Sequence, residues 1–304
     1  MKIHHEIEPP SRPCALAIGF FDGFHRGHRE IVRAMRRRRA AGTNAAVLTF
    51  VDHPAAYLRP GTEPPLLTTL DERINLLAAA GVDDLYLLPF DARIASIEAR
   101  TFVERVLLGQ LRARALVFGE NFRFGAKRGG DAALAREVCG DRCEVVAVRH
   151  VEDGGERISS TRIRALVLAG RMTEANALLG ESYVLRGRVE LGRGKGHDFG
   201  FPTANLVAPA EKTLPADGVY AIVGRYDGRD HAGLVSIGTN PTFDGTARTV
   251  EAWLLDFHAT IYGEELQLRD FRFVRAQQRF ASVDELVAQM LRDATHARFP
   301  SFLT

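Results

Sequence analysis

The first half of the chain alternates apolar segments of strand length with segments of helical periodicity, which limits the folds it can adopt. The expected strands are residues 14–18, 45–50, 85–88, 115–118 and 144–148. Thr69 and Glu72 form the capping-box pattern of one helix, which ends at Gly81. Apolar residues from Phe102 onward mark another helix, closed by Gly109. Such alternation predicts an α/β fold in which helices cover both faces of a parallel sheet.

After residue 183 the segments become short, β-rich and punctuated by glycine. The expected strands here are residues 184–190, 218–225, 232–237, 250–257 and 265–274. Two short helices, 161–169 and 173–179, precede this change, and a helix with the capping-box residues Ser282 and Glu285 closes the chain. The pattern predicts a small antiparallel barrel with a terminal helix. Since single cores stop growing near about 250 residues, we expect two domains, residues 1–183 and 184–304.

The sequence GFFDGFHRGH, residues 19–28, directly follows the first expected strand. A Gly-rich turn between a strand and a helix directs backbone N–H groups and the helix dipole at an anion. His25 and His28 fall on one face of the first helical turn, where their N–H donors can follow charge growing on a phosphate, and Gly27 allows a nucleotide close to the backbone. The alternative, a pair of core or solvated histidines, is disfavoured by the glycines and Asp22 around them. We therefore predict a nucleotide phosphate site.

Three further segments of the first half have the character of site loops. TFVDHP, residues 49–54, is either a site loop or a turn fixed by Pro54. GENFRFGAKRGG, residues 119–130, carries two phenylalanines that we expect to be exposed and suited to a flat ring. ISSTRIR, residues 158–164, places hydroxyls and arginines at a helix start, which favours a polyphosphate clamp over a simple N-cap.

The second half has its own cluster, GRGKGHDFGFPTANL, residues 192–206. It is not a P-loop, because no Gly-Lys-Ser/Thr follows at the required spacing. Its basic Gly-rich part can fold over phosphates, whereas Thr203 and Asn205 offer the hard oxygen donors that Mg²⁺ prefers. The alternative is a structural turn at Pro202.

A candidate base follows this cluster. The loop SIGTNPTFDG, residues 236–245, precedes the apolar strand VEAWLLDF, and Glu251 lies at the start of this strand. A carboxylate beside a phosphate site is a candidate general base for a hydroxyl group.

The overall charge argues against large charged partners. The 40 Lys and Arg residues nearly balance the 38 Asp and Glu residues, so no net field would hold nucleic acid or a membrane surface. The arginine cluster 36–39 is interpreted as a solvated helix face; nucleic-acid binding is the alternative, and no aromatic residues accompany it.

Cysteine usage and the N-terminal stretch indicate the compartment. Cys14, Cys139 and Cys143 form neither an even disulfide framework nor a zinc pattern. The polar N-terminal stretch lacks the apolar core of a signal peptide, and no run approaches the roughly 18 apolar residues of a membrane span. We expect a cytoplasmic protein.

Taken together, the motifs resemble those of the bifunctional prokaryotic riboflavin kinase/FAD synthetase family. The HxGH spacing is similar to the signature of Rossmann-like nucleotidyltransferases, and the resemblance continues in order through TFVDHP, GENFRFG, ISSTRIR, GFPTANL, GVY, SIGTNPTF and VEAWLLDF. It implies an α/β Rossmann-like FMN adenylyltransferase domain, residues 1–183, followed by a riboflavin kinase domain, residues 184–304, built as a small six-stranded antiparallel β-barrel with a C-terminal helix. Such an enzyme phosphorylates riboflavin to FMN with ATP and then adenylylates FMN to FAD, releasing pyrophosphate.

The resemblance also implies residue roles. The catalytic residues would be His25, His28 and Glu251. In the adenylyltransferase, ATP would bind at Gly19, Phe21, Asp22, Gly23, Gly27, Ser159, Ser160, Thr161 and Arg164. The flavin would bind there at Asp52, His53, Asn121, Phe122, Phe124 and Gly125. In the kinase, ATP and its phosphates would bind at Gly192, Gly194, Lys195, His197, Gly200, Pro202, Thr203 and Asn205. Thr203 and Asn205 would also hold Mg²⁺, the expected cofactor.

Two positions depart from the family pattern. Lys195-Gly196-His197 stands where Arg-Gly-Arg is common, so one phosphate contact would depend on histidine protonation. Phe20 is bulkier than expected, and either narrows the turn or packs inward.

Other readings of the sequence make different predictions. A chain in which only the adenylyltransferase works would convert FMN but not riboflavin. A flavin-binding or regulatory protein would bind flavin without consuming ATP. A tRNA-ligating enzyme is excluded because a lysine-rich KMSKS-like loop is missing. We expect riboflavin, FMN and ATP as partners, neither nucleic acid nor a membrane, and weak self-association.

Overall fold

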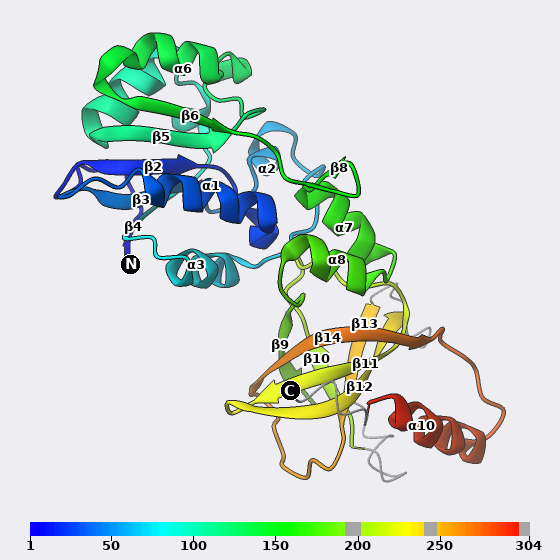
Figure 1. Ribbon diagram of the computed structural model, residues 1–304. Coiled ribbons are helices and arrows are strands. Elements are labelled where there is room, and N and C mark those ends of the chain that lie inside the picture. The colour runs from blue at the N-terminus through cyan, green and yellow to red at the C-terminus, as the bar shows by residue number, and fades with distance from the viewer. Residues whose placement is uncertain (192–201, 240–247, 298–304) are drawn as a thin grey trace. The chain divides into compact units, whose positions relative to one another are not determined.

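The computed structural model describes residues 1–191, 202–239 and 248–297 (Figure 1). The chain divides into two compact units, Met1–Ser160 and Thr161–Thr304. Helices α7 (Ser160–Leu168) and α8 (Met172–Leu179) therefore fall almost wholly in the second unit. The expected boundary after residue 183 stays a prediction about where the functional domains divide.

The first unit contains a six-stranded sheet in the order β1-β4-β3-β2-β5-β6, and every neighbouring pair is parallel. The strands are β1 (Lys2–His4), β2 (Cys14–Ile18), β3 (Asn44–Phe50), β4 (Asp84–Leu88), β5 (Ala113–Gly119) and β6 (Glu144–Val148). The predicted parallel sheet is confirmed. Its carboxyl edge, where ligands bind in open α/β sheets, is where the candidate site loops begin.

Alternate residues of β2 enter two different cores. Cys14, Leu16 and Ile18 pack on the face covered by α5 (Ala99–Thr101), η2 (Phe102–Gln110) and α6 (Ala132–Cys139). Ala15 and Ala17 pack on the opposite face, with α1 (Arg26–Arg37) and α3 (Leu70–Ala79). Figure 1 shows α1 and α3 on one side of the sheet and α6 on the other. Burial on both faces explains why the whole strand is apolar.

Two predicted helix boundaries can be compared with the structure. The capping box of α3 is confirmed: the Thr69 side chain accepts from Glu72 N, and Glu72 accepts from Thr69 N. The helix expected to end at Gly109 instead continues to Gln110 as a π-helix, in which Leu111 N donates to Val106 O, five residues back. Tight apolar packing of Val103, Val106 and Leu107 on the sheet outweighs the glycine as a stop signal.

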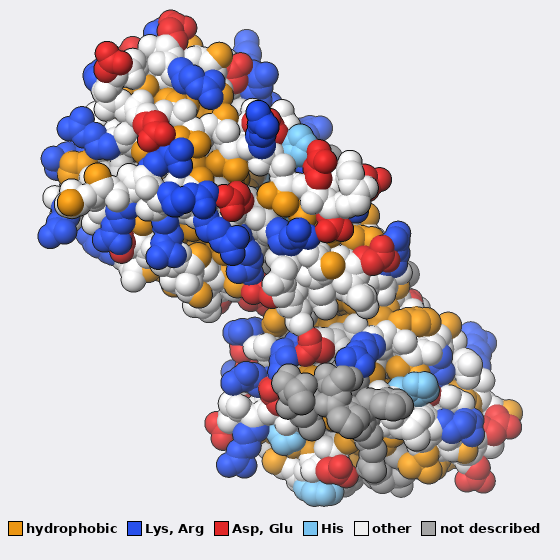
Figure 2. Space-filling view, in the orientation of Figure 1, with side chains coloured by type: hydrophobic (Ala, Val, Ile, Leu, Met, Phe, Trp, Pro, Cys, Tyr) orange, Lys and Arg blue, Asp and Glu red, His pale blue; other side chains and the backbone are white. Residues whose placement is uncertain are grey.

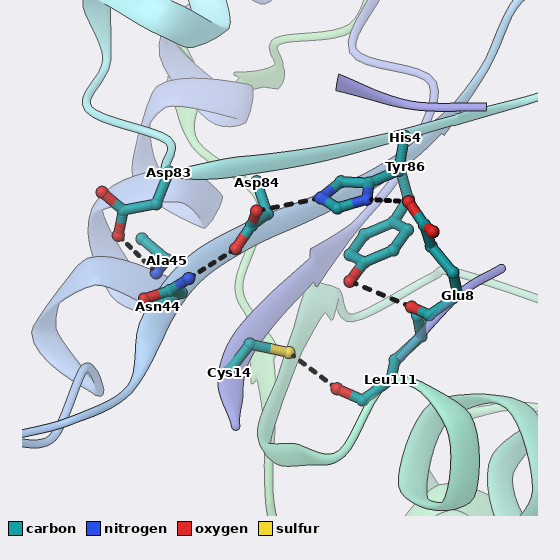
Figure 3. Close-up of polar contacts among 9 residues, drawn as sticks. All are labelled: His4, Glu8, Cys14, Asn44, Ala45, Asp83, Asp84, Tyr86 and Leu111. Carbon is teal, nitrogen blue, oxygen red and sulfur yellow. Dashed lines mark hydrogen bonds and ion pairs between the residues drawn. The ribbon is translucent and has the colours of Figure 1, made fainter. Parts of the chain in front are cut away.

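Strand β1 was not expected, because its sequence is short and polar. His4 is 3% exposed and donates or accepts on both ring nitrogens, at 2.7 Å from Glu8 Oε1 and 2.9 Å from Asp84 Oδ1 (Figure 3). Its ring also stacks on Tyr86, with centroids 4.6 Å apart. Contacts with residues distant in sequence therefore hold this edge strand, and no local periodicity could have revealed it.

Shorter elements complete the first unit. They are η1 (Asp22–Phe24), α2 (Pro54–Leu58), α4 (Ala92–Ala95), η3 (Ala126–Arg128), η4 (Gly140–Arg142), β7 (Glu152–Asp153) and β8 (Glu156–Arg157). All three cysteines are free and buried.

The arginine cluster at the end of α1 is engaged in surface contacts. Arg38 pairs with Glu144 at 2.9 Å, Arg39 pairs with Asp83 at 3.3 Å, and Arg37 pairs with Glu30. Figure 2 shows basic side chains over the region of α1 with acidic side chains among them. These contacts agree with the interpretation as a solvated helix face.

The second unit is built around a closed antiparallel barrel in the order β10-β13-β12-β11-β14-β9. The strands are β9 (Leu185–Glu190), β10 (Ala204–Val207), β11 (Gly218–Tyr226), β12 (Arg229–Thr239), β13 (Arg248–Leu254) and β14 (Glu265–Arg275). Helix α10 (Val283–Ala297) packs its Ala294 and Ala297 against Val219, Ala221 and Val223 of β11. The predicted six-stranded barrel with a terminal helix is confirmed.

The structure corrects the sequence-based predictions for two strands and one helix cap. Residues 204–207 were expected within a ligand loop, but they form β10, which closes the barrel between β9 and β13. The strand expected over residues 250–257 begins at Arg248 and ends at Leu254. At α10, Ser282 accepts from Glu285 N, but Glu285 accepts from Ala281 N, so the reciprocal bond is shifted by one residue.

Among the described residues, no helix is long and apolar enough to cross a membrane.

Candidate active sites

The nucleotide loop, residues 19–28, leaves the carboxyl end of β2 through a turn of unusual backbone conformation. Phe21 has φ 61°, Gly23 has φ 74° and Phe24 has φ 36°. Phe21 and Phe24 are both buried in the core beneath the loop. Packing of these two rings holds non-glycine residues in the left-handed region, which fixes the path of the chain into α1.

The two predicted catalytic histidines lie together. His25 is the N-cap of α1, and its Nδ1 accepts from His28 N at 3.3 Å. The two rings stack with centroids 3.7 Å apart, and the Phe21 ring meets His28 edge-on at 5.3 Å. A Cβ at Gly27 would lie 3.1 Å from His25 Cε1, so this glycine makes room for the imidazole. Its role in admitting a nucleotide stays a prediction.

Both imidazoles are held neutral. Burial, followed by the positive charge of Arg157, lowers the pKa of His25 to about 4. Burial, His25 and Arg157 lower the pKa of His28 well below 6.5. Within the described chain, Nδ1 of His28 is buried without a hydrogen-bond partner. A neutral imidazole still offers an N–H donor, and an entering phosphate would favour its protonation. The sequence did not single out Arg157, which lies in β8 just before ISSTRIR.

Asp22 ties the nucleotide loop to a neighbouring segment. Its Oδ1 accepts from Leu67 N at 2.9 Å, from Thr68 N at 3.0 Å and from Thr68 Oγ1 at 3.2 Å. The Ser160 hydroxyl donates to the Asp22 carbonyl oxygen at 2.9 Å. These contacts give Asp22 a structural function, while its predicted contact with ATP stays untested.

The expected polyphosphate clamp is divided between the two compact units. Ser159 and Ser160 belong to the first unit, whereas Thr161 and Arg164 belong to the second. Arg164 is 8% exposed on α7, beside Ile163 and Val167. The clamp therefore stays a prediction.

The loop of residues 49–54, which we call the β3 loop, was predicted to be either a site loop or a turn fixed by Pro54, and it has features of both. Pro54 is the first residue of α2, and His53 Nδ1 caps this helix by accepting from Ala55 N at 3.1 Å. His53 also meets the Phe20 ring edge-on, with centroids 4.8 Å apart. One predicted flavin residue thus lies beside the nucleotide loop, and Phe20, the departure from the family pattern, forms the contact.

The NFRFG loop departs from its predicted exposure. Phe124 is only 7% exposed and packs among Phe102, Phe118 and Phe122, which itself lies partly buried against the same core. A Cβ at Gly125 would lie 2.5 Å from the Ala99 Cα, so glycine is required where the loop passes Ala99 at the start of α5. Phe124 therefore anchors the loop in the core, and the flavin contacts predicted for this loop, at Asn121, Phe122, Phe124 and Gly125, stay predictions.

A buried arginine that the sequence did not single out lies beneath both loops. Arg73 of α3 is 1% exposed, and its guanidinium donates to the carbonyl oxygens of Phe20, Phe50 and Val51. It lies on the apolar stripe of the helix, three residues after Leu70 and four before Leu77. A cation on an apolar stripe is the signal that could have identified it.

Two of the predicted kinase residues, Asn205 and Glu251, lie in one row across the barrel. Asn205 of β10 is directly opposite Glu251 of β13 and Glu190 of β9, and Glu251 is opposite Ser236 of β12. Directly opposite residues point to the same face of a sheet. Glu251 lies in the middle of β13, and not at the start of a strand as expected. Gly192, Gly194, Lys195, His197 and Gly200 lie outside the described residues.

A cavity of about 550 Å³ lies between the segment after β14 and helix α10. Its lining includes Arg279 and Phe280 from that segment and Glu285, Gln289 and Arg292 from the helix. It combines one aromatic ring with several polar side chains.

Two family models match the chain in succession. The FAD synthetase model matches residues 7–162, and the riboflavin kinase model matches residues 179–299.

Curated relatives match along nearly the whole chain. A bifunctional riboflavin kinase/FMN adenylyltransferase of Listeria monocytogenes is 35% identical, covering 97% of this chain and 96% of the relative. The protein of that name from Escherichia coli K12 is 36% identical over 97% and 95%, respectively. A crystal structure described as a macrolide-efflux protein from Streptococcus pneumoniae has a TM-score of 0.88 at 32% identity and covers 98% of this chain and 99% of that one.

Proposed function

The chain belongs to the family of bifunctional riboflavin kinase/FMN adenylyltransferases, and we propose that its barrel makes FMN from riboflavin and that its parallel-sheet domain converts this FMN to FAD. The observation that carries the proposal is the succession of both family models along one chain. The sheet domain presents the HxGH histidines on a strand-to-helix turn, and the barrel presents Asn205 beside Glu251.

In the kinase reaction the ribityl 5′-hydroxyl of riboflavin attacks the γ-phosphorus of ATP. The new O–P bond forms as the bond to ADP breaks, and the hydroxyl proton passes to the Glu251 carboxylate. Phosphoryl transfer depends chiefly on positioning and charge neutralisation, so one base and a set of phosphate ligands are sufficient.

The donor chemistry of this row fits a hard divalent cation. The Asn205 amide oxygen is the kind of donor that Mg²⁺ accepts, and Glu251 on the same face adds negative charge. Thr203 and Asn205 would hold the ion with the ATP phosphates. When bound, Mg²⁺ neutralises phosphate charge, while Glu251 keeps its own function as acceptor of the hydroxyl proton.

In the adenylyltransferase reaction a phosphate oxygen of FMN attacks the α-phosphorus of a second ATP. An O–P bond forms to FMN, the bond to pyrophosphate breaks, and the protein needs no nucleophile. His25 and His28 offer N–H donors to the charge that grows on the phosphate oxygens. The residues of ISSTRIR bind the triphosphate of ATP, whose β- and γ-phosphates leave as pyrophosphate, and the β3 and NFRFG loops receive the flavin.

We place the enzyme in the cytoplasm, where ATP is available and where its three free cysteines would remain reduced. Its partners are riboflavin, FMN and ATP. Weak self-association is an expectation that a sedimentation measurement would settle.

The testing experiment is a time course with purified protein, riboflavin, ATP and Mg²⁺, in which the flavins are separated by chromatography. We expect FMN to rise and then give way to FAD. Untouched riboflavin, with added FMN still converted to FAD, would mean that only the adenylyltransferase works and that the Lys195/His197 variant had disabled the kinase. Flavin binding without ATP consumption would contradict both activities.

A further inference from the structure

Arg73 occupies a position where an apolar side chain would be expected. It is among the largest fully buried side chains, and it lies in the core between α3 and the carboxyl ends of β2 and β3. Helix α3 starts at its Thr69 cap independently of this side chain. The helix therefore does not require arginine here.

The guanidinium joins two loops that leave different strands. Its Nη1 donates to the Phe20 carbonyl oxygen at 3.1 Å, in the nucleotide loop. Its Nη2 donates to the carbonyl oxygens of Phe50 and Val51, both at 2.8 Å, in the β3 loop. Carbonyl groups at strand ends have lost their ladder partners, and a planar fork of donors can satisfy several of them at once.

A ring contact strengthens the same link. The guanidinium carbon of Arg73 lies 4.2 Å from the centroid of the Phe20 ring. The same Phe20 ring also makes the edge contact with His53. Arg73, Phe20 and His53 thus form a continuous packed unit that runs from one loop into the other.

This arrangement is costly for stability alone. Within the described chain, all three hydrogen bonds of the Arg73 side chain go to backbone carbonyl groups, and its Nε is buried without a partner. Burial lowers the pKa of Arg73 to about 10, although the nearby charges of Asp22 and Asp52 raise it, and the side chain therefore stays cationic at neutral pH. A buried cation without a hydrogen-bonded carboxylate is usually less favourable than an apolar residue of similar volume.

We propose that Arg73 is a positioning residue for adenylyl transfer, which fixes the nucleotide loop and the β3 loop relative to each other. The inference rests on the proposed function, in which the first loop holds ATP beside His25 and His28 and the second lies beside the flavin. In-line attack requires the attacking oxygen of the FMN phosphate to lie about 3 to 3.5 Å from the α-phosphorus of ATP and in line with the bond that breaks, and a misplacement of about 1 Å can cost about 100-fold in rate. Arg73 controls this register without touching either substrate.

If the nucleotide loop and the β3 loop are no longer fixed relative to each other, kcat should fall while each loop still binds its own ligand. For R73M, which keeps the volume and removes the charge and the fork, we expect kcat for FAD synthesis to fall about 100-fold, with KM for ATP and FMN changing less than about threefold. R73K, which keeps the charge but not the fork, should recover part of kcat. R142K is the matched control, because Arg142 also donates to two carbonyl groups, those of Val138 and Cys139, and lies in η4, which belongs to neither loop.

The experiment measures steady-state FAD synthesis from FMN and ATP by each variant, riboflavin kinase activity on the same samples, and thermal unfolding. Wild-type protein that makes no FAD from FMN would refute the proposed function itself. If the wild type is active, three results would overturn the inference: unchanged kcat in R73M, a rise in KM alone, or loss of the folded first domain in R73K, which would assign Arg73 to the fold. Reduced kcat, intermediate in R73K, with kinase activity and R142K unchanged, would support it.

Discussion

The imidazole rings of His25 and His28 stack at 3.7 Å between centroids, with an interplanar angle of 18°. Two adjacent protonated rings would repel each other, and the guanidinium of Arg157 adds to that repulsion. Both imidazoles are therefore neutral in the free protein, and the negative charge of a bound triphosphate would favour their protonation.

Replacing His28 tests its catalytic function. We expect His28→Ala to lower kcat for FAD synthesis about 100-fold to 1000-fold, because a donor to the transition state is lost, while FMN binding changes little. Chromatographic assay of FAD and a fluorescence titration of FMN give the two quantities. His5→Ala, at an exposed histidine of the same unit, is the control. Unchanged FAD output from purified His28→Ala would remove His28 from the mechanism.

Acidification should destabilise the first unit. His25 has a pKa of about 4 in the folded state and about 6.5 when unfolded, so the unfolded chain binds more protons between these values. The free energy of unfolding then falls as pH decreases, by about 2 kcal/mol from pH 7 to pH 5 for His25 alone. Denaturant unfolding across this range measures it. His25→Asn should flatten the profile; an equally steep profile in that variant would assign the effect to other groups.

The Asp22 carboxylate should matter more for stability than for ligand binding. Asp22→Ala leaves two buried backbone N–H groups, those of Leu67 and Thr68, without their acceptor and should cost about 2 to 4 kcal/mol. Asp22→Asn keeps an acceptor oxygen and should cost less. Urea unfolding measures the loss, and ATP titration of the folded Asn variant tests the predicted nucleotide contact. Equal stability of all three proteins would contradict the anchoring function.

The base of the kinase reaction is testable without disturbing the other activity. Glu251→Gln should lower FMN formation from riboflavin about 100-fold or more, since the hydroxyl proton loses its acceptor. FAD synthesis from added FMN should continue at the normal rate. Glu265→Gln, at an exposed position of β14, serves as the control. Wild-type kinase activity in Glu251→Gln would require another base.

An ion pair joins the terminal helix to the barrel. Asp293 is 3% exposed; its Oδ2 accepts from Nε of Arg275 at 2.9 Å and lies 2.9 Å from Nη2 of the same guanidinium. Asp293→Asn would leave the largely buried guanidinium uncompensated, so the second unit should lose about 3 kcal/mol. Thermal unfolding compared with the exposed control Asp284→Asn measures the effect. A difference within error would place α10 outside the cooperative unit.

Local patterns were sufficient for most of the fold. The strand at 14–18, the capping box of Thr69 and Glu72 and the antiparallel barrel follow from periodicity and turn chemistry, which act over a few residues. The nucleotide loop could be identified for the same reason, because its glycines and histidines lie within ten consecutive positions.

Only the tertiary structure decided which distant segments of the chain contact each other. His4 forms a strand because Asp84 and Tyr86 lie beside it. Phe124 is buried because Phe102 and Phe118 meet it. Arg73 reaches the ends of two strands that are separate in sequence. A sequence by itself determines local backbone preferences and which motifs are present. Burial, pKa values and the joining of loops depend on which side chains come together in space, and that information exists only in the folded chain.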